Sequence, residues 1–142
     1  MKSNRDVLAS VLKTTQMGQT GIRSVIPYTT HQEFKQALCS QKKEYDEIEQ
    51  EAYNLAASRG WDLNDLEPFA KAMSKLCAYG SLAFNPNDSK IAAMMINGNT
   101  KGMVKGLKNL NHCKQDDPAV ISLSKRLLEC EEANIKQMQG YV

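Results

Sequence analysis

The sequence lacks the features that mark several large classes of protein. Its 142 residues include 18 basic and 16 acidic side chains, for a net charge of +2, so it has no excess of basic charge such as nucleic-acid-binding domains carry. No apolar run approaches the roughly 20 residues that a membrane-spanning helix needs. Residues 1–6 turn acidic before any apolar stretch begins, which argues against a signal peptide. We expect a cytoplasmic protein that binds neither nucleic acid nor membrane.

Metal-binding and catalytic motifs are scarce as well. The four cysteines are Cys39, Cys77, Cys113 and Cys130. They form no C-x-x-C pair, and widely spread thiols of this kind are typical of packed cysteines in a reducing compartment. Only His112 and Cys113 are adjacent, and neighbouring residues of a helix point about 100° apart, so we expect no zinc site there. The chain has no G-x-S-x-G motif, phosphate-binding loop or dinucleotide fingerprint.

Helical periodicity, by contrast, runs through the whole chain. Apolar residues recur every three or four positions in five segments. The first ends near residue 26, and the others span about 31–60, 65–85, 88–111 and 118–140. Pro27 and Gly60 stop the first two segments, and the run 85–88 is the clearest breaker. Residues 29–31 offer caps for the second segment, and Asp88 or Ser89 for the fourth. No segment shows the alternation of a strand, so the sequence predicts one all-α domain over residues 1–142.

The lengths of the segments and links predict a topology. The first two segments are joined by a short link, and so are the last two, which is typical of antiparallel helical hairpins. Residues 60–88 carry a shorter helix and two loops, enough chain to return along the whole bundle. Two hairpins joined by a long crossover are the ferritin-like arrangement of the four-helix bundle, with an extra helix in the crossover. A simple up-and-down bundle of five helices is the alternative.

Several polar residues lie on or beside the apolar stripes, near the middle of their segments. Because the middles of antiparallel helices meet at one level, we expect these side chains to form a buried polar cluster. The candidates are Gln16, Gln19, Gln41, Glu44, Tyr45, Asn99, Glu131 and Asn134. The Tyr45 hydroxyl is placed to close this network.

Three stretches carry a resemblance to a known family. Residues 16–18 (Gln-Met-Gly), 44–48 (Glu-Tyr-Asp-Glu-Ile) and 131–135 (Glu-Glu-Ala-Asn-Ile) make the chain similar to a small, bacterioferritin-related branch of the ferritin-like superfamily. Di-iron members of that superfamily use a Glu on each of two helices and an E-x-x-H on each of the other two. The resemblance implies that Gln16 and Asn99 stand at the two single Glu positions. The E-x-x-H positions would fall on Glu44-x-x-Glu47 and on Glu131-x-x-Asn134.

This ligand set is incomplete for two irons. It offers carboxylates only at Glu44, Glu47 and Glu131, it has amides elsewhere, and it lacks imidazole altogether. We therefore expect no cofactor and a hydrogen-bonded polar network in place of the metal. The alternative is iron or another divalent cation held by those three glutamates.

Three glycines spaced four residues apart point to close helix packing. Gly98, Gly102 and Gly106 share one helical face, and each glycine costs a helix about 1 kcal/mol relative to alanine. Close approach of another helix of the bundle would explain them, and so would a seam between two subunits.

The sequence favours a non-catalytic protein, although it leaves the question of enzymatic activity open. The leading hypothesis is a structural, self-associating ferritin-like bundle, most simply a homodimer, whose metal site has become a polar core. An iron-binding or storage protein, or a di-iron oxidoreductase with an atypical carboxylate site, is the alternative. A third possibility is an adaptor that presents a helix groove, or a protein of the spore-coat type.

Overall fold

The described part of the chain is helical throughout. The computed structural model describes residues 2–63, 86–114 and 116–142. They form four α-helices, α1 (Asn4–Val25), α2 (Gln32–Arg59), α4 (Asp88–His112) and α5 (Pro118–Gln139), with a short 3-10 turn η1 (Ile26–Tyr28) after α1. The prediction of an all-α fold is confirmed, and the four helices begin and end within a few residues of the predicted points. The predicted segment 65–85 lies outside the described residues.

Local signals explain where the first two helices begin and end. Ser3 caps α1 in a capping box with Asp6, each side chain accepting a hydrogen bond from the other's backbone N–H. The α-helix ends at Val25, two residues before Pro27. The αL conformation of Gly60 (φ 68°) closes α2, a conformation that glycine adopts without strain.

The caps of α2 and α4 differ from the expected ones. His31 is the N-cap residue of α2, but its side chain makes no capping bond within that helix. Asp88 instead accepts hydrogen bonds from the backbone N–H groups of Thr30 and His31, at 2.9 and 3.1 Å. Asn87, one residue earlier than expected, caps α4 by accepting from the N–H of Lys90 at 2.8 Å. Asp88 therefore does not cap its own helix and binds the turn before α2 instead. Local sequence does not reveal this long-range contact.

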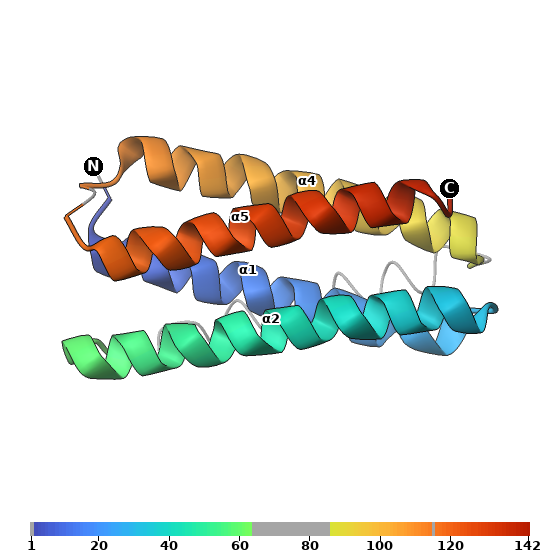
Figure 1. Ribbon diagram of the computed structural model, residues 1–142, viewed down its shortest axis with the longest axis horizontal. Helices are drawn as coiled ribbons and strands as arrows, with labels where there is room; N and C mark the ends of the chain where they lie inside the picture. The colour runs from blue at the N-terminus through green and yellow to red at the C-terminus, as the bar shows by residue number, and fades with distance from the viewer. Residues whose placement is uncertain (1, 64–85, 115) are drawn as a thin grey trace.

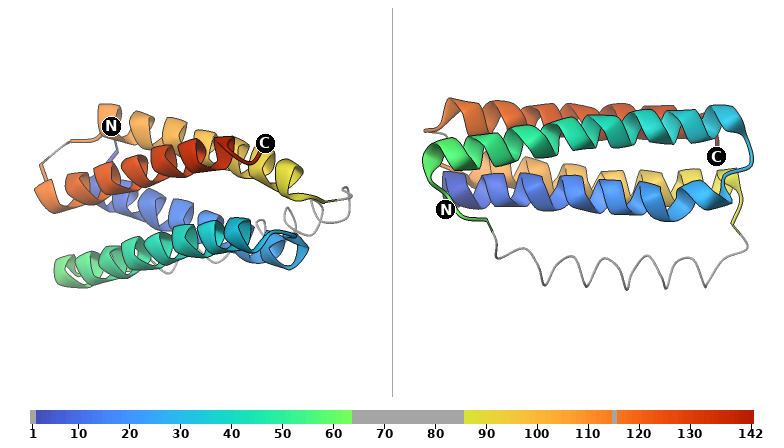
Figure 2. Two further views of the ribbon diagram at one scale, coloured as in Figure 1. Left: turned by 45° about the vertical axis from the view of Figure 1, so that its right-hand side comes forward. Right: turned by 90° about the horizontal axis from the view of Figure 1, so that it is seen from below.

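The four helices pack as two pairs whose neighbours run antiparallel (Figures 1 and 2). The start of α1 lies beside the end of α4, where the Lys2 N–H donates to the His112 carbonyl at 3.1 Å. The starts of α2 and α4 lie at the opposite end, joined through Asp88. Hence α1 and α5 run in one direction and α2 and α4 in the other, and α2 ends at the opposite end of the bundle from the start of α4.

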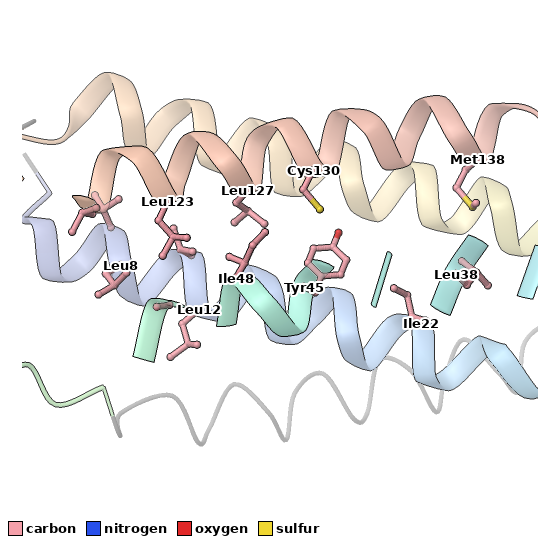
Figure 3. Packing of buried hydrophobic residues seen from close by; sticks show 14 of the residues in the cluster. Leu8, Leu12, Ile22, Leu38, Tyr45, Ile48, Leu123, Leu127, Cys130 and Met138 are labelled. Carbon is pink, nitrogen blue, oxygen red and sulfur yellow. The ribbon is translucent and has the colours of Figure 1, made fainter. Parts of the chain in front are cut away.

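An apolar core runs along the axis of the bundle (Figure 3). All four described helices contribute to it, and Leu8, Leu12, Leu38 and Ile48 are fully buried. Among the described residues, Tyr45 is the largest fully buried side chain, and it lies in the middle of this row with its hydroxyl directed toward α5. The row of buried apolar side chains thus carries a phenolic hydroxyl near its centre. None of the four described helices has the length and apolar content to span a membrane.

Candidate functional site: a polar core at the middle of the bundle

Tyr45 reaches the centre of the bundle because α1 leaves room for its ring. A Cβ atom added to Gly18 of α1 would lie 2.5 Å from the ring carbons Cε2 and Cζ of Tyr45. No other residue type fits at position 18 unless the ring shifts. The sequence places Gly18 beside two glutamines, but nothing local shows that an aromatic ring from another helix lies against it.

The Tyr45 hydroxyl is the hub of a buried network from α2, α4 and α5. It donates to Asn99 Oδ1 at 2.8 Å and lies 3.1 Å from Glu131 Oε2. Asn134 Nδ2 donates to the same hydroxyl at 3.3 Å. The Asn99 amide is oriented by its Nδ2, which donates to the Met95 carbonyl at 2.8 Å and so turns Oδ1 toward Tyr45. Three helices therefore meet at one phenolic oxygen.

The number of protons that these side chains can donate favours a neutral Glu131 carboxyl. The Tyr45 hydroxyl has a single proton, which the shorter contact assigns to Asn99 Oδ1. The contact with Glu131 then becomes a hydrogen bond only if the carboxyl carries its own proton and donates it to Tyr45 Oη. Glu131 is 3% exposed, and burial raises the pKa of its carboxyl from 4.5 to about 8, although a hydrogen bond donated by Tyr45 to the ionised carboxylate would act in the opposite direction. Geometry and desolvation thus agree on a protonated acid at neutral pH.

The neighbouring titratable groups are also held in their neutral forms. Burial raises the pKa of the Tyr45 hydroxyl far above its ordinary value, and the Glu131 carboxyl adds to that rise. Burial likewise raises the pKa of the Cys130 thiol to about 12. Cys130 Sγ accepts a hydrogen bond from Asn134 Nδ2 at 3.7 Å. A thiol with so high a pKa is a poor nucleophile, so Cys130 adds no activated sulfur to the described part of the site.

Glycine at position 102 brings α4 close to the Glu131 carboxyl. A Cβ at Gly102 would lie 2.7 Å from Glu131 Oε1, whereas one at Gly106 would make an ordinary 3.6 Å contact with Leu128. Both positions therefore face α5 inside the bundle. Gly98 differs, because a Cβ there would meet no described atom within 4 Å. Close packing against another helix therefore accounts for Gly102 and Gly106 and not for Gly98.

The other polar candidates lie around the core, outside the Tyr45 hub. Gln41 is buried and donates to Gln137 at 2.8 Å, and Gln19 is buried and donates to Asp46 at 2.9 Å. Gln16 is only half-buried and donates to the hydroxyl of Tyr53 at 3.1 Å, on the flank of the bundle. The expectation that Gln16 meets Asn99 and Glu131 is therefore wrong. Its long side chain starts about 100° from the inward direction of Thr15 and reaches solvent instead.

Glu44 and Glu47 also lie away from the hub. Both pair with Arg126 of α5, at 3.1 and 3.2 Å, and Glu51 pairs with the same guanidinium at 2.6 Å. Among the described residues, no three His, Cys, Asp or Glu side chains are grouped closely enough to hold a metal ion. Of the three glutamates named as possible ligands, only Glu131 lies in the core. The expected meeting of Glu44 with Glu131 fails because Tyr45, the next residue, takes the inward position and Arg126 attracts Glu44 outward.

The sequence interpretation missed a second polar group next to the hub. Ser10, Asn109 and Ser124 are 6%, 3% and 4% exposed. Ser124 lies on the apolar stripe of α5, four residues after Val120, so the helical pattern places it inward, although it was not among the predicted polar candidates. Asn109 was not among the predicted candidates because it lies near the end of α4 and not at its middle.

Comparisons of the chain with protein-family models, with curated proteins and with solved structures found no match. What the polar core does must be inferred from its geometry.

Proposed function

We propose that this protein is a ferritin-like helical bundle with a structural, non-catalytic and self-associating role, in which a hydrogen-bonded core occupies the level where di-iron relatives hold metal. One observation carries the proposal: the convergence of Asn99, Glu131 and Asn134 on the Tyr45 hydroxyl. The helix directions support it, since two antiparallel hairpins in which α2 and α4 run the same way are what a ferritin-like crossover requires.

Iron does not fit the residues at this level. Two ferrous ions carry four positive charges and need carboxylate and imidazole ligands. The core offers one carboxyl, and that group is neutral at pH 7. Tyr45 takes the inward position on α2, while Asn99 and Asn134 supply amides, which are neutral and weak ligands. A bulky phenol at the centre also fills the volume that a metal pair would occupy.

Self-association is supported by apolar side chains on the outside of α4. Met94, Val104 and Leu107 are 36%, 47% and 44% exposed. Apolar side chains exposed along one helix are common where a protein meets a partner. A homo-oligomer, most simply a dimer, would cover them.

Two measurements test the proposal. Elemental analysis of untagged protein from iron-rich cultures should find fewer than one iron per two chains, with the same content in a Glu131→Gln variant. Iron that is stoichiometric in the wild type and lost in Glu131→Gln would overturn the metal-free core and favour an iron protein. Sedimentation should show an oligomer at micromolar concentration, and a strict monomer at all concentrations would remove the self-associating role.

A further inference from the structure

A small cavity lies beside the Tyr45 hub, between α1, α4 and α5. Its volume is about 10 Å³, and its polar lining comes from Ser10, Thr14, Asn109, Ser124 and Glu131. Gly102 and Gly106 form its α4 wall, so the absence of side chains there creates the space. A cavity of this size is at the lower limit for one water molecule, and a water is stable only where it finds two to four polar partners. The lining supplies that number.

One buried atom in this lining is unsatisfied. Ser124 is 4% exposed, and its Oγ has no hydrogen-bond partner among the described residues. A serine in a helix commonly donates to the carbonyl one turn earlier, but this hydroxyl does not. A buried hydroxyl without a partner is unfavourable, and native proteins rarely keep one. Ser124 therefore calls for a partner in the cavity that it lines.

The cavity also separates two hydrogen-bonded networks. On one side, Lys2 Nζ donates to Asn109 Oδ1 at 2.8 Å, and Asn109 Nδ2 donates to Ser10 Oγ at 2.7 Å. On the other side, Glu131 is hydrogen-bonded to Tyr45 through Oε2, and its Oε1 lies next to Gly102. Ser10 already accepts a hydrogen bond and keeps its own proton to donate. Both networks thus present polar atoms to the same small space.

We propose that this cavity is a binding site for a single water molecule, which hydrogen-bonds the Ser124 hydroxyl and joins the Lys2–Asn109–Ser10 network to Glu131. The proposal rests on the metal-free polar core proposed above. The bound water gives the interior carboxyl a hydrogen-bonded path toward the surface at Lys2, near the end of α4.

Water–protein nuclear Overhauser effects test the site directly. Methyl protons do not exchange with solvent, so a cross-peak between water and a buried methyl reports a bound water molecule. We expect cross-peaks for Val11, Leu127 and Leu128, which line the cavity. The buried methyls of Leu38 are the control and should show none. Absence of the cavity cross-peaks would overturn the proposal.

A matched pair of serine variants tests the hydrogen bond. Ser122 is exposed on the same helix, so Ser122→Ala measures the effect of helix propensity alone. If water occupies the cavity, Ser124→Ala removes one of its partners and should have a Tm about 3 °C below that of Ser122→Ala. In a dry cavity, Ser124→Ala would remove an unsatisfied hydroxyl and raise the Tm above that of Ser122→Ala, which would overturn the proposal. Iron bound in the core would appear in elemental analysis, whereas a dry cavity would appear only in the nuclear Overhauser and Tm comparisons, so failure of the proposed function can be told apart from failure of this site.

Discussion

Helices α1 and α4 lie side by side but are held in the bundle by different forces. Of the ten residues that α1 buries, six are apolar, among them Leu8, Leu12 and Ile22, and four are polar. The buried residues of α4 are Asp88, Ile91, Ala92, Asn99 and Asn109, of which three are polar. Apolar burial favours any close packing, whereas a buried polar group is satisfied only by a particular partner. The comparison teaches that α1 supplies stability and that α4 is positioned by three polar anchors, at its start, middle and end.

The largest expected effect is a pH dependence of the free energy of unfolding. It originates at Glu131, which shares the Tyr45 hydroxyl with Asn99, the middle anchor of α4. Burial raises the pKa of Glu131 from 4.5 to about 8 in the folded state. Between these values the folded protein holds a proton that the unfolded chain has lost. The free energy of unfolding should therefore fall as the pH rises through this window, by about 1.4 kcal/mol per pH unit. This contribution is fully present below pH 4.5 and is lost once the pH exceeds about 8.

Urea denaturation at successive pH values, with Glu131→Gln as the control, measures this dependence. The glutamine side chain has nearly the same shape and no proton to lose, so the variant should lack the decline. Parallel pH profiles for the two proteins would show that Glu131 is already ionised at neutral pH, against the neutral carboxyl that the hydrogen bonds of the core favour.

A leucine pair tests the apolar attachment of α1. Leu12 is fully buried in α1, whereas Leu107 of α4 is 44% exposed. Leu12→Ala should lower the free energy of unfolding by about 2–5 kcal/mol, since it removes buried methyl groups and leaves a cavity. Leu107→Ala should change it by less than about 0.5 kcal/mol. Equal losses for the two variants in chemical denaturation would contradict the comparison.

A glycine pair tests the close approach of Tyr45 to α1. Gly18→Ala places a Cβ within 2.5 Å of the Tyr45 ring, and such overpacking should destabilise the protein by about 1–3 kcal/mol. A Cβ at Gly21 of the same helix meets no described atom within 4 Å, so Gly21→Ala should stabilise by about 1 kcal/mol through helix propensity. Thermal denaturation should shift the two variants in opposite directions. A rise in Tm for both would mean that the ring does not pack against Gly18.

The smallest effect concerns the middle anchor of α4. Asn99→Ala removes the acceptor of the Tyr45 hydrogen bond and should destabilise the protein by about 1 kcal/mol more than Asn97→Ala. Asn97 is exposed on the same helix and corrects for the change in propensity. Amide hydrogen exchange should also become faster along the middle of α4 in Asn99→Ala alone. Identical exchange in the two variants would remove Asn99 from the set of anchors.

Sequence patterns were sufficient to predict the described helices but only part of the polar core. In α2 the predicted candidates Gln41 and Tyr45 are both buried, and so are the apolar residues Phe34, Leu38 and Ile48, which recur at the helical spacing of the second predicted segment. Periodicity works there because each of these residues points to the centre of the buried face. It fails for Gln16 and Glu44, which lie at the border of such a face, where a partner on another helix decides the direction of a long side chain.

Close contacts between helices are also invisible to local reasoning. The spacing of Gly98, Gly102 and Gly106 suggested that all three face one neighbouring helix or a second subunit, yet a Cβ at the first would meet no described atom within 4 Å and a Cβ at the second would meet a carboxyl. Gly18 stands alone in its pattern but receives the largest fully buried side chain among the described residues. What each glycine does depends on the residue that faces it across the bundle, and no spacing within one helix reveals that residue.

The attachment of Asp88 to the turn before α2 has a consequence for how the two hairpins find each other. Its carboxylate accepts four hydrogen bonds from Thr30 and His31, the shortest at 2.7 Å from His31 Nδ1. At the far end, Asp117 binds the Arg59 guanidinium through both oxygens. Both ends of the second hairpin thus recognise the first without relying on covalent continuity. Two separately expressed fragments, 1–63 and 86–142, should reassemble by complementation, with Asp88 and Asp117 as the docking points.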